Sequence, residues 1–234
     1  NAGCGALYPQ ELARHVRERR ADAGLAFDGD GDRLIAVDER GDTLTGDHIM
    51  TICAKTLKAN GLLRNNMVIA TAMSNFGFRQ AMLRMDIAVE EADVGDRYVL
   101  KMMREKGAVF GGEDSGHIIF LNLHTTGDGI ISALQLLASL QSSGKKLSEL
   151  RGLLQLAPQK MINVNVVRKP LLAEVKPLQE AVCRAEKELA GTGRVIVRYS
   201  GTQPVCRVMV ESMDQAVTDR IAGALAEIAR ANLA

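Results

Sequence analysis

The sequence LAFDGDGDRLIAV at residues 25–37 places a short acidic segment between two apolar runs. The apolar runs have the length and composition of buried strands. Between them, glycines alternate with the three aspartates Asp28, Asp30 and Asp32. Glycine permits the tight backbone turn that brings three carboxylates together. Clustered carboxylates repel one another unless a cation lies between them, and hard oxygen ligands favour Mg²⁺ or Ca²⁺. The segment therefore predicts a metal site between two strands.

Two other interpretations compete with a magnesium site. The spacing resembles the start of a calcium-binding EF-hand loop, with Glu39 as its last ligand, but the position that must be glycine holds Arg33. The flanking runs also indicate strands rather than helices, so we reject the EF-hand. A solvated acidic turn is the structural alternative. Arg33 favours the functional interpretation, because it is placed to contact an anionic ligand, and Mg²⁺ keeps coordination positions open for phosphate oxygens.

The composition narrows the class of protein. The apolar fraction of 47% and the charged fraction of 24% are ordinary for a globular chain. Aromatic residues make up only 3%, without tryptophan, which argues against stacking on nucleic-acid bases. With a net charge of +1, the chain as a whole has no strong electrostatic attraction for nucleic acid or for a membrane surface. No apolar run reaches membrane-spanning length, and scattered cysteines fit reduced thiols. We expect no nucleic-acid or membrane partner and a cytoplasmic location.

Outward from the acidic loop, strands alternate with helices. We expect helices at residues 11–20, 46–60, 75–84, 95–106 and 128–141, and strands at residues 25–27, 34–37, 67–73, 87–89 and 118–121. This alternation indicates an α/β fold with a largely parallel sheet.

The pattern changes after Pro158 to β-α-β-β-α, which indicates a small α+β domain. Its expected elements are residues 161–167, 171–190, 194–199, 206–210 and 214–232. We therefore divide the chain into three parts. Residues 1–44 end a metal-binding α/β domain, residues 45–157 form a second α/β domain with a mixed sheet, and residues 158–234 form the small α+β domain.

A second candidate loop has the sequence GGEDSGH at residues 111–117. Glycines at both ends allow a ligand to approach closely. Glu113 and Ser115 can hydrogen-bond sugar hydroxyls, and His117 can bind phosphate when protonated or transfer a proton near neutral pH. On its own this signal is weak, since such loops are common and a single histidine is more often structural.

A third candidate loop, RYSGTQP at residues 198–204, follows a predicted strand. Hydroxyls and backbone N–H groups of such a loop can surround an anion. Arginine side chains on both sides can bind phosphate through paired N–H donors. The alternative is a hairpin with solvated arginines. The anion-binding set is Arg198, Ser200, Gly201, Thr202 and Arg207.

These three loops, in this order, resemble the α-D-phosphohexomutases, and within them the bacterial phosphoglucosamine mutases. The segments VGDRYV at residues 94–99, TTGDG at residues 125–129 and RVMVE at residues 207–211 strengthen the resemblance, which covers essentially the whole chain. It implies a four-domain enzyme, of which the first domain carries a catalytic phosphoserine. The expected reaction interconverts glucosamine 6-phosphate and glucosamine 1-phosphate through a bisphosphate intermediate, for cell-wall precursor synthesis.

The resemblance also implies residue roles. Asp28, Asp30 and Asp32 would bind Mg²⁺, and Arg33 would be catalytic beside the phosphoserine. The remaining residues would bind a small-molecule sugar phosphate: Arg97, Glu113, Ser115, His117, Arg198, Ser200, Gly201, Thr202 and Arg207.

Several points stay open. Gln203 stands where the family usually has glutamate, and Tyr199 stands where a smaller or basic residue is common. These differences alter the charge of the third loop. The chain starts without methionine and without the phosphoserine domain, so we expect a piece of a longer enzyme that is inactive alone. The alternatives are a phosphomannomutase or phosphoglucomutase, or a truncated sugar-phosphate binding protein without turnover. A homodimer is an option that the sequence leaves open.

Overall fold

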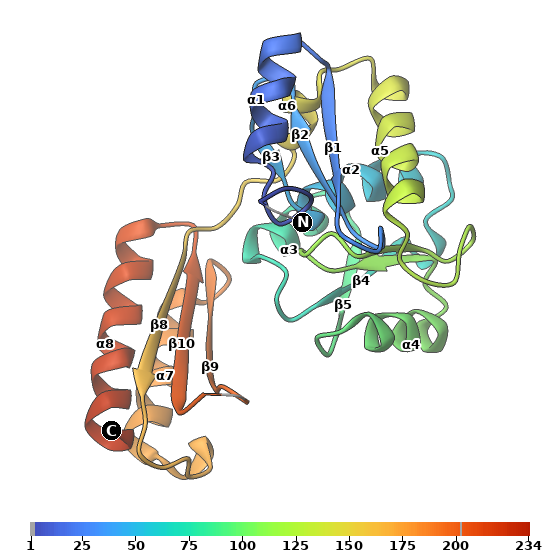
Figure 1. Cartoon of the computed structure of the whole chain (residues 1–234). Coiled ribbons are helices and arrows are strands. Elements are labelled where there is room, and N and C mark those ends of the chain that lie inside the picture. The colour runs from blue at the N-terminus through green and yellow to red at the C-terminus, as the bar shows by residue number, and fades with distance from the viewer. Residues whose placement is uncertain (1–2, 202) are drawn as a thin grey trace. The chain divides into compact units, whose positions relative to one another are not determined.

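The computed structural model of the chain describes residues 3–201 and 203–234. The chain forms two compact units, Asn1–Gln155 and Leu156–Ala234, and each is described by itself (Figure 1). The unit boundary lies close to the predicted end of the second α/β domain. Thr202, one of the predicted phosphate-binding residues, lies outside the described residues.

Unit 1 begins with a helix on a small antiparallel sheet. Helix α1 (Gln10–Arg19) is followed by strands β1 (Ala23–Phe27), β2 (Leu34–Asp38) and β3 (Thr43–Leu44), in the sheet order β1-β2-β3. Val16 of α1 packs on Val37 of β2. A side chain at Gly24 would meet Val16 at 2.6 Å, so glycine lets α1 lie close to the sheet. The acidic loop is the β1–β2 connection, as predicted.

The rest of unit 1 is an α/β layer around a mixed sheet of order β5-β4-β6-β7. Strands β5 and β6 run parallel to β4, and β7 is antiparallel to β6. The strands are β4 (Met67–Thr71), β5 (Ala88–Ala92), β6 (Phe110–Gly112) and β7 (Ile118–Phe120). The helices are α2 (Gly46–Ala59), α3 (Phe76–Arg84), α4 (Asp96–Lys106), α5 (Gly129–Ser143) and α6 (Leu147–Arg151), with a 3₁₀ turn η1 (Arg64–Asn66).

Successive side chains of β4 point to opposite faces of the sheet. Because both faces are buried, alternate residues of β4 belong to two different hydrophobic cores. Val68 and Ala70 lie in the large core with Phe78 of α3 and Phe110 of β6. Ile69 lies in a smaller core beneath α4. The hydrophobic pattern of β4 and its neighbours therefore specifies a layer between helices, and the predicted α/β class is confirmed.

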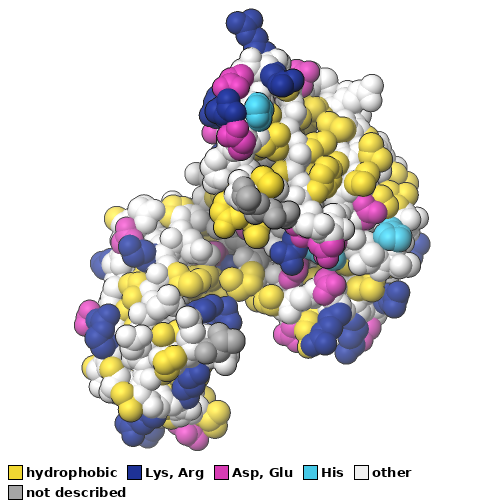
Figure 2. Space-filling model, in the orientation of Figure 1, with side chains coloured by type: hydrophobic (Ala, Val, Ile, Leu, Met, Phe, Trp, Pro, Cys, Tyr) yellow, Lys and Arg dark blue, Asp and Glu magenta, His cyan; other side chains and the backbone are white. Residues whose placement is uncertain are grey.

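The outer side of α5 exposes apolar side chains. Ile130 is 62% exposed and Leu134 is 59% exposed, one helical turn apart. Leu25 on β1 is only partly buried. Figure 2 shows hydrophobic side chains gathered over β1 and α5 on this face.

Unit 2 is a three-stranded antiparallel sheet covered by two helices. Its elements are β8 (Gln159–Asn165), a 3₁₀ turn η2 (Leu172–Glu174), α7 (Lys176–Leu189), β9 (Gly193–Tyr199), β10 (Val205–Ser212) and α8 (Gln215–Leu233). The sheet order is β8-β10-β9. The β-α-β-β-α pattern is therefore as predicted. Helix α7 starts later than the predicted residue 171, because Pro177 occupies its first turn and the 3₁₀ turn precedes it.

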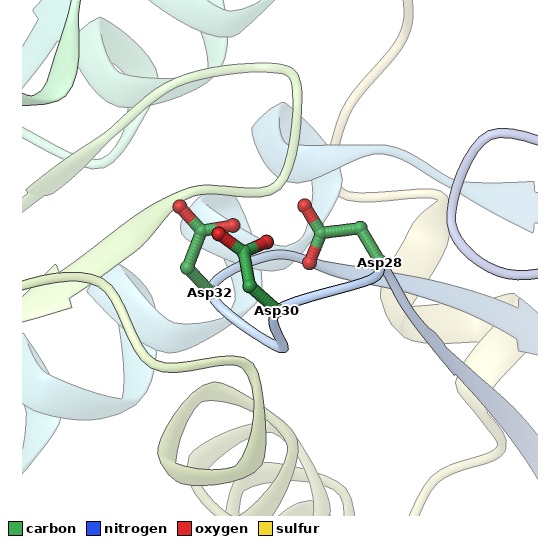
Figure 3. Close-up of side chains that lie close together, drawn as sticks. All are labelled: Asp28, Asp30 and Asp32. Carbon is green, nitrogen blue, oxygen red and sulfur yellow. The ribbon is translucent and has the colours of Figure 1, made fainter.

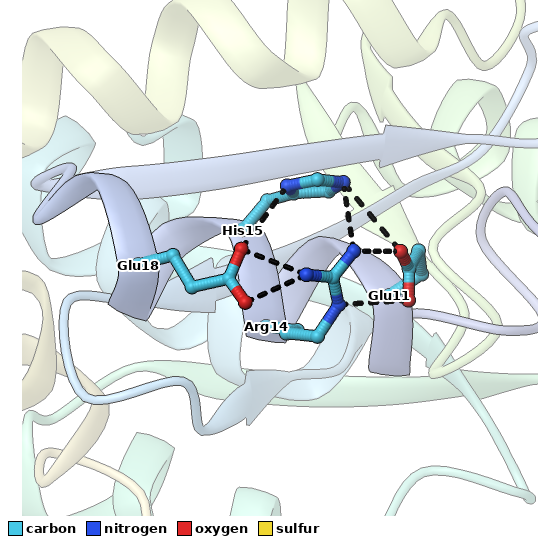
Figure 4. Close-up of polar contacts among 4 residues, drawn as sticks. All are labelled: Glu11, Arg14, His15 and Glu18. Carbon is cyan, nitrogen blue, oxygen red and sulfur yellow. Dashed lines mark hydrogen bonds and ion pairs between the residues drawn. The ribbon is translucent and has the colours of Figure 1, made fainter.

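The exposed side of α1 carries a small charge network. Arg14 donates hydrogen bonds to Glu11 and Glu18, and His15 lies within ion-pair distance of both glutamates (Figure 4). These partners lie three and four residues apart, which is the spacing of neighbours on a helix surface. Because all four side chains are exposed, the network has little bearing on the fold.

Within the described residues, none of the helices combines the length and the hydrophobicity that crossing a membrane requires.

Candidate functional site

The acidic loop brings its three carboxylates together. Ligand atoms of Asp28, Asp30 and Asp32 all lie within 4.8 Å of one another. Figure 3 shows the three side chains rising from the same side of the loop. Gly31 has a φ of +77°, a conformation that glycine adopts without strain, and this turn reverses the chain between Asp30 and Asp32.

The electrostatics of the loop favour a bound cation. Burial and a hydrogen bond with Asp28 raise the pKa of Asp32, whereas its contact with His117 lowers it. The Nε atom of Arg33 lies 3.5 Å from Asp28 Oδ2 and 3.7 Å from Asp32 Oδ1, so it neutralises part of the negative charge. Oδ1 of Asp32 is nevertheless buried and accepts no hydrogen bond within the described residues. Three converging hard oxygen donors with an unused lone-pair site fit Mg²⁺.

The second candidate loop packs directly on the acidic loop. It is the turn between β6 and β7, and the backbone of Arg33 forms a β-bridge with that of His117. The N–H of Leu34 donates to Gly116 O at 3.0 Å. Gly116 has a φ of +94°, and a side chain there would meet Leu34 O at 2.2 Å. Glycine is therefore required at Gly116 for β2 and this turn to lie side by side.

Asp114 fixes the other side of the same turn. Its backbone oxygen accepts a 2.9 Å hydrogen bond from Gly46 N, and its Oδ1 accepts from Asp47 N at 3.2 Å. Both donors belong to the first turn of α2. Asp114 was not predicted as a site residue. Its partner Asp47 lies 67 positions earlier in the sequence, and no local pattern indicates that the two are in contact.

His117 is buried, with only 3% of its surface exposed. Its Nδ1 lies 2.9 Å from Asp32 Oδ2, and Gly127 N donates to its Nε2 at 3.2 Å. Both ring nitrogens are therefore engaged within the protein. The ring of His117, a predicted sugar-phosphate contact, thus lies between the acidic loop and the loop that precedes α5.

Glu113 and Ser115 belong to this turn, and Arg97 lies in the first turn of α4. Oε1 of Glu113 accepts a 3.0 Å hydrogen bond from Gly95 N, which joins the turn to the start of α4. Ser115 is exposed. Arg97 is also exposed, and its guanidinium lies 4.5 Å from the centre of the Tyr98 ring and donates to the Tyr98 hydroxyl at 2.6 Å.

A further loop that the sequence analysis did not assign to the site completes the frame. Gly129 N donates to Gly31 O at 2.8 Å, which joins the acidic loop to the start of α5. A side chain at Gly129 would meet Arg33 O at 2.7 Å, and one at Gly127 would meet His117 Nε2 at 2.4 Å. Both glycines belong to the TTGDG segment of the sequence. Their role became clear only from their contacts with His117 and Arg33, which are distant in the sequence.

In unit 2, the third candidate loop connects β9 to β10. Arg198 and Arg207 are directly opposite each other in the antiparallel register. Their neighbours Val197 and Val208 face α7 and α8, so both arginines project from the other face of the sheet. Neither forms an ion pair within the described residues, and the Nε of Arg207 is buried without a hydrogen-bond partner there.

The backbone of this loop is held from outside. Lys169 Nζ donates to the carbonyl oxygens of Ser200 at 2.8 Å and Gln203 at 3.1 Å, and lies 5.9 Å from the centre of the Tyr199 ring. The Ser200 hydroxyl accepts from Gln203 N at 3.2 Å, and Gly201 is exposed. Lys169 was not predicted as a site residue. It adds a third positive charge beside the loop.

Two family models match parts of the chain. Residues 45–156 match the model of the phosphoglucomutase/phosphomannomutase alpha/beta/alpha domain III. Residues 161–228 match the model of the phosphoglucomutase/phosphomannomutase C-terminal domain. Together the two matches include most of the chain.

Curated relatives match over the whole chain. Phosphoglucosamine mutase of Nitratidesulfovibrio vulgaris is 52% identical over 233 residues, which are 100% of this chain and 52% of the relative. Phosphoglucosamine mutases of Syntrophobacter fumaroxidans and Bacillus licheniformis are 49% and 46% identical, covering 99% and 100% of this chain and 51% and 52% of their own lengths. This chain therefore spans about half the length of the curated relatives it matches.

Solved structures share the fold at low sequence identity. The N-acetylphosphoglucosamine mutase of Aspergillus fumigatus, in complex with GlcNAc-6P and magnesium, is 21% identical with a TM-score of 0.74, covering 99% of this chain and 53% of that chain. A phosphoglucomutase/phosphomannomutase family protein from Burkholderia thailandensis is 20% identical with a TM-score of 0.75, covering 97% of this chain and 50% of that chain.

Proposed function

The chain belongs to the phosphoglucomutase/phosphomannomutase family, and we propose that it is the metal-binding and sugar-phosphate-binding part of a phosphoglucosamine mutase. The proposed reaction interconverts glucosamine 6-phosphate and glucosamine 1-phosphate. The observation that carries this proposal is the packing of the acidic loop on the Glu113–Gly116 turn, because it joins a metal site to a candidate sugar site. The similarity to phosphoglucosamine mutases supports the choice of sugar.

We assign Asp28, Asp30 and Asp32 as the Mg²⁺ ligands, on the basis of their convergence and of Asp32 Oδ1, which accepts no hydrogen bond within the described residues. Bound there, Mg²⁺ supplies positive charge that stabilises a phosphoryl group during its transfer. Arg33 lies against two of these carboxylates and is 42% exposed, so it can turn toward an incoming phosphate without leaving the loop. We therefore propose Arg33 as the catalytic arginine beside the phosphoserine.

We assign Glu113 and Ser115 to sugar hydroxyls, with Arg97 as a further ligand contact. Glu113 is oriented by its bond from Gly95, and Ser115 is exposed at the tip of the turn. In unit 2, Arg198, Ser200, Gly201, Thr202 and Arg207 are the proposed site for the phosphate that does not react. Two arginines lie directly opposite each other and have no acidic partner among the described residues. This supports the assignment, because such a pair is stabilised by a bound anion.

The division into three domains also remains a proposal. The match to the domain III model begins at residue 45, and the match to the C-terminal domain model begins at residue 161. Residues 1–44 precede both matches. We assign these first residues to the metal-binding domain of the longer protein. A cytoplasmic location is part of the same proposal, and it agrees with four cysteines that are all free.

The complete reaction requires a phosphoserine, which we expect in the part of the relatives that this chain does not span. Phosphoserine would donate its phosphoryl group to the sugar phosphate, the bisphosphate would reorient, and the other phosphoryl group would return to serine. The present chain supplies metal ligands, a charge-stabilising arginine and ligand-binding loops. We therefore expect it to bind sugar phosphate but not to interconvert the two isomers alone.

The test is a mutase assay on the full-length product of the gene that encodes this chain. Glucosamine 6-phosphate, glucose 6-phosphate and mannose 6-phosphate are supplied separately with Mg²⁺. We expect the highest kcat/KM with glucosamine 6-phosphate. A preference for glucose or mannose phosphate would instead establish a phosphoglucomutase or phosphomannomutase. A reading frame that begins near residue 1, with binding but no turnover, would establish a binding protein.

A further inference from the structure

Lys169 contacts the β9–β10 loop from a segment outside the sheet of unit 2. It lies between the end of β8 and the 3₁₀ turn η2. Its Nζ donates to Ser200 O at 2.8 Å and to Gln203 O at 3.1 Å, in residues 31 and 34 positions further along the chain. Ser200 and Gln203 lie on the two sides of Gly201, so one ammonium group holds the backbone of the loop on both sides of this glycine.

The ammonium group lies on the side of the loop opposite to the two arginines. Nζ of Lys169 is 5.9 Å from the centre of the Tyr199 ring, a distance at which a cation is attracted to the face of an aromatic ring. Tyr199 packs against the core that α7 and α8 form with the sheet. Because successive side chains of a strand alternate, Arg198 projects from the other face, together with Arg207. Lys169 is therefore placed to act on the loop itself rather than to join the arginine pair.

The geometry of the peptide group determines what this contact does to the loop. The carbonyl of Ser200 and the N–H of Gly201 belong to one trans peptide group and point in opposite directions. A carbonyl drawn toward Lys169 thus directs the Gly201 N–H away from the lysine. This N–H has no hydrogen-bond acceptor among the described residues. The peptide group after Gln203 ends at Pro204, which has no N–H, so the second contact withdraws a carbonyl without turning a donor.

We propose that Lys169 is a positioning residue of the phosphate site in unit 2. It holds the carbonyl oxygens of Ser200 and Gln203, which would repel an anion, and leaves the Gly201 N–H to face the phosphate group of the ligand. The ring of Tyr199 supplies the surface on which the ammonium group rests. This inference rests on the proposed phosphate-binding role of the β9–β10 loop.

The first test is calorimetric titration of the full 234-residue chain with inorganic phosphate. Lys169→Met removes the ammonium group and keeps a side chain of nearly the same length. We expect the phosphate affinity to fall by about three- to tenfold, because the loop is then ordered only when the anion binds. Since Lys169 is exposed, the thermal midpoint should change little.

A conservative variant and a matched control accompany this titration. Lys169→Arg keeps the positive charge and several N–H donors for the two carbonyls, so its affinity should stay within about twofold of the unchanged protein. Lys187→Met removes an exposed lysine of α7 from the same unit and should leave the affinity unchanged. Equal losses in Lys187→Met and Lys169→Met would overturn the inference, because the general charge of unit 2 would then account for both.

Ionic strength separates positioning from simple attraction between charges. Salt at about 0.5 M screens exposed charges beyond a few ångströms, so a loss caused only by the missing charge of Lys169 would largely disappear there. We expect the ratio of the affinities of the unchanged protein and Lys169→Met to be the same at low and high salt. A ratio that falls to one at high salt would contradict the positioning role.

Arg207→Met distinguishes a failure of this inference from a failure of the phosphate site. If Arg207→Met weakens phosphate binding and Lys169→Met does not, the phosphate site stands and the positioning role is wrong. If neither variant weakens binding, the proposed phosphate site fails and Lys169 positions no ligand site.

A measurement on the unchanged protein applies even if a variant fails to fold. Amide proton–nitrogen spectra follow Gly201 during the phosphate titration. We expect its proton resonance to move downfield, because a hydrogen bond to a charged oxygen deshields the proton. A Gly201 amide that does not shift at saturating phosphate would overturn the inference.

Discussion

Arg198 and Arg207 present two positive charges directly opposite each other on adjacent strands. Like charges in this position destabilise a sheet unless an anion lies between them. Lys169 adds a third cation, and it is held by two carbonyl oxygens of the loop rather than by a carboxylate. This cluster supports the proposed phosphate site, because a bound anion would relieve the repulsion between the two arginines.

Replacement of Arg207 by methionine should therefore separate binding from folding. We expect Arg207→Met to weaken binding of inorganic phosphate by about tenfold, since a hydrogen bond to a charged group contributes about 1.5–3 kcal/mol. The melting temperature in phosphate-free buffer should not fall, because one of two repelling charges is removed. Calorimetric titration with phosphate measures the first effect.

The matched control for Arg207→Met is Arg184→Met, in which an exposed arginine on α7 is removed from the same unit. Its phosphate affinity should remain that of the unchanged protein. An equal loss in both variants would show that the general charge of unit 2, rather than the β9–β10 loop, attracts phosphate.

His48 illustrates a buried titratable residue outside the candidate site. Burial, and then the nearby Arg151, lower the pKa of His48 from 6.5 to about 4. Its Nδ1 accepts from Thr45 N at 3.3 Å, and together these residues form the capping box of α2. The neutral ring is therefore the form that fits the folded protein.

This pKa difference predicts acid sensitivity. The unfolded chain binds a proton at His48 near pH 6.5 and the folded chain only near pH 4, so stability is retained above pH 6.5 and decreases as the pH falls toward 4. The loss should amount to about 3 kcal/mol at pH 4. His48→Gln can preserve the capping box and should reduce this decrease.

The measurement is urea unfolding at pH 7, 5.5 and 4, followed by hydrogen-exchange mass spectrometry of peptides from unit 1. Carboxylates titrate both in the unchanged protein and in His48→Gln. The difference between their two profiles of unfolding free energy against pH therefore reports the contribution of His48. Parallel profiles for the two proteins would contradict the assignment.

Two glycines have opposite consequences for the elements that contain them. Gly116 lies where β2 meets the β6–β7 turn, has a φ of +94° and allows no room for a side chain. Gly223 lies within α8, and a side chain added there would meet nothing within 4 Å. Glycine is required in the first position, but in the second it only weakens a helix.

We expect Gly116→Ala to destabilise unit 1 by about 2 kcal/mol or more, through strain at positive φ and a clash with the backbone of Leu34. Gly223→Ala should stabilise unit 2 by about 1 kcal/mol, because alanine has the higher helix propensity. Urea unfolding with the same hydrogen-exchange detection measures both. Stabilisation by Gly116→Ala would show that this turn is not held against β2 in solution.

The chain as a whole has separate hydrophobic cores. The cores of unit 1 contain residues up to Leu154, whereas the core of unit 2 starts at Ile162, and the two units share no core residue. Because cooperative unfolding follows contiguous packing, the two units should not unfold as one.

We therefore predict two unfolding transitions in urea. Gly116→Ala should shift only the transition of unit 1 peptides, and Gly223→Ala only that of unit 2 peptides. A common shift of both transitions by either variant would show that the units stabilise each other.

Much of this molecule could be predicted from the sequence, for physical reasons that are local. Prediction of the acidic loop required only the alternation of glycine and aspartate between two apolar runs, because a turn depends on the conformations of its own residues. Most helices and strands followed from hydrophobic periodicity, since each element buries one face or two. The β-α-β-β-α order of unit 2 followed in the same way. The short elements β3 and α6 were not predicted, because two and five residues contain too little periodicity.

Tertiary structure decided how the loops meet. Asp114 contacts the start of α2, Gly129 contacts Gly31, and His117 contacts Asp32, and in each case the partners are far apart in the sequence. No local pattern encodes these contacts, since they result from the packing of the acidic loop, the β6–β7 turn and the starts of α2 and α5 against one another. The sequence determined that a carboxylate cluster and a histidine-containing turn exist. Packing determined that the histidine is buried against the cluster, because the start of β2 and the β6–β7 turn lie side by side.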